Sequence, residues 1–139
     1  MRASSHSNKD ILRIAFDLDC TLTKKFSFDY INIPATEHYN FYMKCKPNKT
    51  MIELCNKYKK DGHEVFIFTS RATEHFYVTK RWLRKNKVKY HYLIMNKPYY
   101  DIIYDDKSKE VIFEEEKEGA VRKNAKAESS IKEEPNFNR

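Results

Sequence analysis

An apolar run meets two carboxylates in the stretch IAFDLDCTLT, residues 14–23. The run begins at Ile11 and ends at Phe16, and Asp17 and Asp19 follow it with one residue between them. A short apolar run of this kind favours a strand of a parallel sheet that is buried on both faces. Carboxylates at its end need a cation, a proton or solvent, because burying them without a partner costs free energy. Taken alone, the pattern also fits an ordinary Asx turn and a solvated loop.

Outward from this stretch, apolar runs alternate with segments of helical periodicity. The alternation predicts βαβ units with right-handed crossovers. We therefore expect an α/β fold, a Rossmann-like three-layer parallel sheet. Strands are predicted at residues 11–16, 65–68, 90–95 and 102–104, and helices from Pro47 to Gly62, with Asn48 or Thr50 as its cap, and from about Thr73 to Asn86.

The length of 139 residues fits one domain. We expect residues 11–113 to form it, with residues 24–46 as a short hairpin or flap and residues 111–113 as a small edge strand. Residues 1–10 read as a polar, flexible leader. The charged tail, residues 114–139, is expected to be disordered.

Several site classes are excluded by composition. The chain has only two glycines and no Gly-rich phosphate-binding loop. Its three cysteines, Cys20, Cys45 and Cys55, form no CxxC pair, which argues against a zinc site and fits a reducing compartment. No signal peptide and no membrane-spanning stretch is visible, so we expect a cytoplasmic protein without a membrane partner.

The net charge of +7 is carried by the first part of the chain. Residues 107–139 hold eight basic and eight acidic residues, so residues 1–106 hold nineteen of the 27 basic and twelve of the 20 acidic ones. A basic surface favours anionic ligands. Its sign alone does not separate small phosphorylated compounds from nucleic acid.

Polar side chains follow all four predicted strands. In an open parallel sheet the ligand lies outside the carboxyl ends of the strands, where these side chains would meet. Carboxylates suit Mg²⁺, a hydroxyl and an ammonium can hold phosphate, and a carboxylate can attack phosphorus while a second acid moves the proton. The candidates are Asp17 and Asp19 after the first strand, Thr69 and Ser70 after the second, Lys97 after the third, and Asp105 and Asp106 after the fourth.

Four motifs, FDLDCTLT, FTSR, NKP and IIYDD, stand in this order between residues 11 and 108. In this the chain resembles phosphatases of the haloacid dehalogenase (HAD) superfamily, and small capless members near capsule and sugar-phosphate metabolism in particular. Cys20 departs from the glycine that is frequent at its place in that family. The resemblance implies a nucleophile at Asp17, a general acid/base at Asp19 whose backbone carbonyl also binds metal, phosphate binding by Thr69 and Lys97, and metal binding by Asp105 and Asp106.

These features predict a hydrolase, a Mg²⁺-dependent phosphomonoesterase that acts through an aspartyl-phosphate. A sugar phosphate or a nucleotide is the expected substrate. One alternative is a phosphatase for the 3′ or 5′ ends of nucleic acids, which the basic body and the open site suggest. The other is a catalytically silent HAD-like domain that binds an anion or a partner. The sequence leaves the oligomeric state open.

Overall fold

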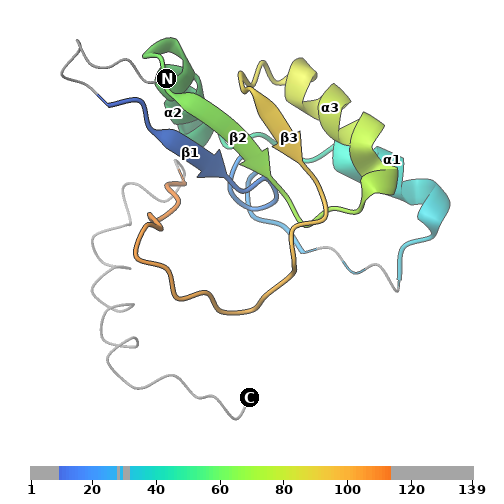
Figure 1. Ribbon diagram of the computed structural model, residues 1–139. Helices are drawn as coiled ribbons and strands as arrows, with labels where there is room; N and C mark the ends of the chain where they lie inside the picture. The colour runs from blue at the N-terminus through green and yellow to red at the C-terminus, as the bar shows by residue number, and fades with distance from the viewer. Residues whose placement is uncertain (1–9, 28, 30–31, 114–139) are drawn as a thin grey trace.

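The computed structural model describes residues 10–27, 29 and 32–113. Most of the predicted leader, all of the predicted tail and three residues of the predicted flap lie outside this part. Three strands and three α-helices alternate along the chain (Figure 1). They are β1 (Arg13–Phe16), α1 (His38–Met43), α2 (Lys49–Lys60), β2 (Glu64–Phe68), α3 (Phe76–Lys85) and β3 (Tyr92–Ile94), with 3-10 turns at Ala35–Glu37 and Thr73–His75.

The strands form one parallel sheet in the order β1-β2-β3. Ala15 pairs with Phe66, and Phe66 pairs with Tyr92 on its other side. Three of the predicted strands and the α/β class are thereby confirmed. β1 and β3 are shorter than predicted, because only the part of each apolar run that faces a partner joins the ladder, whereas β2 begins one residue earlier than predicted.

Both long helices pack on the same face of the sheet. The core combines Phe16, Val65 and Ile67 of the strands with Met51 of α2 and Trp82 of α3. Each crossover moves one strand along in the same direction, and right-handed crossovers then place both helices on one side. The described part of the chain has two layers, so the prediction of three layers is wrong for it.

The predicted fourth strand is wrong. Residues 102–104 form no strand in the described part of the chain, and Ile102 and Ile103 are half exposed. Only seven residues separate Ile94 at the end of β3 from Ile102. A parallel crossover needs about a dozen residues, and the open edge of β1 lies on the far side of β2. The chain instead runs as a wide loop below the sheet (Figure 1).

Residues 24–46 were predicted as a short hairpin or flap, and a hairpin is wrong for the second half of this insert. An antiparallel bridge between Thr23 and Pro47 closes the base of this insert. Its second half is α1, which packs against α3, and the indole of Trp82 donates a hydrogen bond to the Cys45 carbonyl at 2.8 Å. His38 and Tyr42, four residues apart, form the buried stripe of this helix.

The limits of α2 follow the prediction. Asn48 caps its first turn and is buried, and Gly62 follows its end with φ of 97°. The Asn48 amide also donates to the carbonyl oxygens of Thr21 and Ile112, at 3.0 and 2.8 Å. Residues 111–113, predicted as an edge strand, are held by this contact without joining the sheet. No helix in the described ranges is both long enough and apolar enough to cross a membrane.

Candidate active site

The loop after β1 is a tight turn around one carbonyl group. The Leu18 carbonyl accepts hydrogen bonds from the backbone N–H groups of Thr21, Leu22 and Thr23, at 2.9 to 3.2 Å. Cys20 occupies the left-handed region, with φ of 61°, which costs a residue with a Cβ more than it costs glycine. Its N–H donates to the Thr23 hydroxyl at 2.8 Å. This turn presents two carboxylates from one short segment.

Asp17 contacts Lys97 beyond the carboxyl ends of the strands. Asp17 Oδ1 lies 3.2 Å from Lys97 Nζ, and its Oδ2 accepts from the Thr21 hydroxyl at 3.2 Å. The backbone fixes Lys97 in this place, because its N–H donates to the Thr69 carbonyl while the Thr69 N–H donates to Ile94, both at 2.9 Å. The predicted convergence of the first and third motifs is therefore seen.

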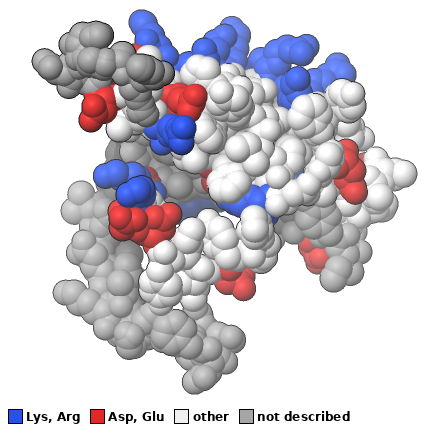
Figure 2. All heavy atoms as spheres, in the orientation of Figure 1, with Lys and Arg blue, Asp and Glu red and all other residues white. Residues whose placement is uncertain are grey.

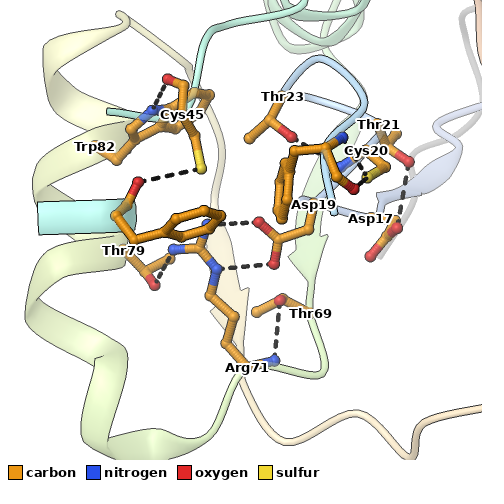
Figure 3. A network of polar contacts seen from close by, with 12 residues as sticks. Asp17, Asp19, Cys20, Thr21, Thr23, Cys45, Thr69, Arg71, Thr79 and Trp82 are labelled. Carbon is orange, nitrogen blue, oxygen red and sulfur yellow. Dashed lines mark hydrogen bonds and ion pairs between the residues drawn. The ribbon is translucent and has the colours of Figure 1, made fainter. Parts of the chain in front are cut away.

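Asp19 is held by Arg71. The guanidinium donates to both carboxylate oxygens of Asp19, at 2.6 and 2.9 Å, and to the Thr79 hydroxyl at 2.9 Å (Figure 3). The ring of Tyr42 lies 3.8 Å from the centre of the guanidinium. Arg71 is almost completely buried, whereas Asp19 keeps 29% of its side chain exposed. A buried, planar, bidentate partner gives Asp19 one fixed orientation toward solvent.

Thr69 and Ser70 follow β2 but differ in exposure. Thr69 is fully buried, and its hydroxyl accepts a hydrogen bond from the Arg71 N–H at 3.1 Å. A hydroxyl that accepts one bond can still donate its proton. Ser70 is exposed. The geometry thus makes Thr69 a support for the turn that carries Arg71, beside its predicted role toward phosphate.

Asp105 and Asp106 lie in a separate exposed turn. The Lys107 N–H donates to Asp105 Oδ1 at 2.9 Å, and Lys107 Nζ lies 3.4 Å from Asp106. Among the described residues, no three His, Cys, Asp or Glu side chains gather into a group that could hold a metal ion. The oxygens of Asp17 and Asp19 contact cationic and hydroxyl groups of the chain. In this arrangement the four acids do not fit the octahedral site that Mg²⁺ prefers.

Cys45 and Cys55 are not activated thiols. Burial raises the pKa of Cys45 to about 11, partly offset by the charge of Arg71. Burial likewise raises the pKa of Cys55 to about 12. Because the thiolate is the reactive form, both groups are poor nucleophiles near neutral pH. A carboxylate, Asp17, is therefore the better candidate.

Three functional side chains were not singled out by sequence reasoning: Arg71, Thr79 and Tyr42. Arg71 is the last residue of the FTSR motif, so its position near the strand ends could be predicted. Its pairing with Asp19 could not. Thr79 and Tyr42 come from a helix and from the insert, and neither carries a sequence signal for the site. Only packing brings them to Arg71.

No family model matches the chain, but it is similar to known proteins over part of its length. A Bacillus cereus protein named "Putative nucleotidase" is 37% identical over 43 residues, which are 31% of this chain and 23% of that protein. A crystal structure from Vibrio cholerae has a TM-score of 0.52 and 24% sequence identity, and the match covers 69% of this chain and 80% of that chain. The structural likeness supports the Rossmann-like α/β fold.

Proposed function

We propose that this protein is a phosphomonoesterase that acts through an aspartyl-phosphate, on a nucleotide or a sugar phosphate. The contact of Lys97 Nζ with Asp17 Oδ1 at 3.2 Å carries the proposal, because it places a phosphate-binding cation beside a candidate nucleophile. Asp19, fixed by Arg71, stands two residues away. The name of the similar Bacillus cereus protein supports chemistry on phosphate esters.

The reaction divides into two steps at Asp17. In the first, a carboxylate oxygen of Asp17 bonds to phosphorus, the ester oxygen leaves, and Asp19 supplies its proton. In the second, Asp19 takes a proton from water, the water oxygen bonds to phosphorus, and the Asp17 carboxylate is released with inorganic phosphate. Lys97 neutralises charge on the phosphoryl oxygens in both steps.

The pairing with Arg71 affects both roles of Asp19. Two N–H bonds from one guanidinium give the carboxylate one fixed direction, in which it can orient the leaving oxygen and the attacking water. In either step Asp19 carries a proton at some point, and one of the Arg71 contacts is then weakened. The geometry therefore favours substrates whose ester oxygen leaves readily and needs little help from a proton.

Aromatic rings beside Lys97 favour a nucleotide over a sugar phosphate. Lys97 Nζ lies 5.2 Å from the centre of the Phe68 ring and 5.6 Å from that of Tyr100. Both rings are partly exposed. A base can stack on such a ring, whereas a sugar phosphate offers it less flat apolar surface.

Mg²⁺ remains the predicted cofactor from the family resemblance, with Asp17, Asp19, Asp105 and Asp106 as its expected ligands. Because these residues do not fit the ion in the described arrangement, the steps above use groups of the chain alone. A magnesium ion would add charge neutralisation at phosphate.

The proposal is tested by Asp17→Asn on a panel of nucleoside monophosphates and sugar phosphates. An amide cannot attack phosphorus as a carboxylate does, so turnover should be abolished while the melting temperature stays near that of the wild type. Asp10→Asn, an exposed acid outside the site, is the matched control. Wild-type rates in Asp17→Asn would refute the nucleophile. A wild-type protein inactive on every compound would favour the silent binding domain.

A further inference from the structure

Among the described residues, no helix covers one face of the sheet. The residues that point away from the core include Ala15 of β1, Phe66 and Phe68 of β2, and Tyr92 and Ile94 of β3. Tyr92 is 50% exposed, and none of the five is buried. Parallel sheets are normally covered on both faces, so an exposed face that carries aromatic rings indicates a ligand or a partner. Figure 2 shows this side of the molecule, where uncharged residues cover most of the surface.

An open hollow of about 630 Å³ joins this face to the β3 edge. Phe66 and Tyr92 line it from the strands, Tyr90 from the segment before β3, and Phe76 from α3. The Phe66 and Tyr92 rings meet edge to face, with centroids 5.3 Å apart. On β2, Phe66 and Phe68 are two residues apart, a spacing of about 6.6 Å along a strand. Successive flat groups of a bound chain could each contact one ring.

Basic side chains border the same hollow. A second hollow of about 260 Å³ shares Lys80 and Tyr90 with the first and is also lined by Arg84, Lys87 and Lys89. Glu64 is the one acidic residue that lines either hollow, and its carboxylate lies 3.3 Å from Arg13. The remaining cations of the second hollow therefore present positive charge next to the aromatic surface.

We propose that the aromatic–basic face binds single-stranded nucleic acid. We define it as the open face of the sheet together with the β3 edge beside it, formed by Phe66, Phe68 and Tyr92 of the strands and by Lys80 and Arg84 of α3. Its bases stack on the rings of β2 and β3, and its phosphates contact the lysine and arginine side chains of the border. Stacking accepts any base, and a row of cations follows the backbone, which is how sequence-tolerant single-strand binding works. An acidic amphipathic helix would match the charge, but the spaced rings favour flat bases. This binding does not depend on the proposed phosphatase chemistry.

The test measures the binding of the full chain to a fluorescent oligothymidylate dodecamer whose two ends carry no phosphate, by anisotropy at several salt concentrations. Because the dodecamer has no terminal phosphomonoester, the candidate active site contributes no hydrolysis. Tyr92→Ala should weaken binding by about fivefold or more, since stacking on one ring is lost. Lys80→Gln with Arg84→Gln should reduce the salt slope by about 0.7 for each phosphate contact removed.

Matched controls keep the proposal falsifiable. Lys49→Gln with Lys60→Gln removes the same charge from the two ends of α2, which line neither hollow, and should leave the affinity within about twofold. Equal losses in the two charge pairs, or no binding by the wild type, would overturn the proposal. So would light scattering that shows a dimer broken by Tyr92→Ala, because a second copy would then cover the face. Binding of a polyglutamate peptide but not of the dodecamer, with the same dependence on Tyr92, would assign the face to an acidic protein instead.

Discussion

Arg71 donates to both carboxylate oxygens of Asp19, at 2.6 and 2.9 Å, although the two residues stand 52 positions apart. The guanidinium is clamped in turn by the Thr79 hydroxyl of α3 and the Tyr42 ring of α1. The insert after β1 and the helix after β2 thus both position Arg71, and through it the Asp19 carboxylate. Through this chain of contacts, residues outside the four motifs fix the orientation of the candidate acid/base.

A double-mutant cycle should show that Arg71 acts through Asp19. We expect Asp19→Asn to lower kcat by about 10² to 10⁴, the usual contribution of general acid–base catalysis, and Arg71→Met to cause a similar loss. The double variant should lose little more than either single variant, because both remove one function. Losses that multiply would show that Arg71 contacts the substrate independently. Thr79→Val, which removes one hydrogen bond to Arg71, should give a smaller loss with the same dependence on Asp19.

Magnesium should raise the melting temperature of the wild-type protein if the predicted metal site forms. Asp105 and Asp106 lie in an exposed turn of their own, so an ion shared with Asp17 would have to draw this turn toward Asp17. A ligand that binds only the folded state stabilises it by RT ln(1 + [L]/Kd), so the melting temperature should rise with the Mg²⁺ concentration. The rise at millimolar Mg²⁺ should disappear in the Asp105→Asn/Asp106→Asn variant. An unchanged melting temperature in the wild type, or a rise that persists in this variant, would contradict the four-acid site.

Asn48→Ala should destabilise the fold by about 2–4 kcal/mol. The change removes the cap of α2 and leaves the carbonyl oxygens of Thr21 and Ile112 without their amide donor. Urea unfolding followed by circular dichroism measures the loss. Asn40→Ala, at an exposed position of α1, is the control and should change the free energy of unfolding by less than about 0.5 kcal/mol. A small effect of Asn48→Ala would mean that water replaces the buried amide.

Stability should fall as the pH is lowered below about 6.5, and His75 should account for part of the fall. Burial lowers the pKa of His75 below its ordinary value of 6.5, against the opposing charge of Glu74. The folded state therefore favours neutral His75, so its contribution is complete above the unfolded pKa and is lost as the pH falls through the folded one. The dependence of stability on pH between pH 7 and pH 5 should be weaker for His75→Phe. It should be stronger for Glu74→Gln, which removes the charge that opposes the shift. Equal slopes in wild type and His75→Phe would rule this source out.

Local signals were enough for much of the fold. The apolar run before Asp17, the cap at Asn48 and the glycine at residue 62 are encoded within a few residues of the elements they limit. Periodicity and capping depend on neighbours in sequence, which is why three strands and two helices could be predicted. The meeting of Asp17 with Lys97 also followed, since parallel strands bring their carboxyl ends to one edge.

Pairing and packing over long distances decided the rest. Residues 102–104 read as a strand, yet a strand exists only with a partner, and the short connection from β3 does not reach the open edge of β1. Arg71 is held in place for Asp19 by Tyr42 of α1 and Thr79 of α3. These contacts exist only when both helices pack around Arg71, so the order of residues in the sequence does not indicate them. The sequence by itself determined the chemistry available at the strand ends and the elements that carry it. The tertiary structure alone decided which carboxylate is held by which cation and which face of the sheet stays open, because both depend on contacts between residues far apart in the chain.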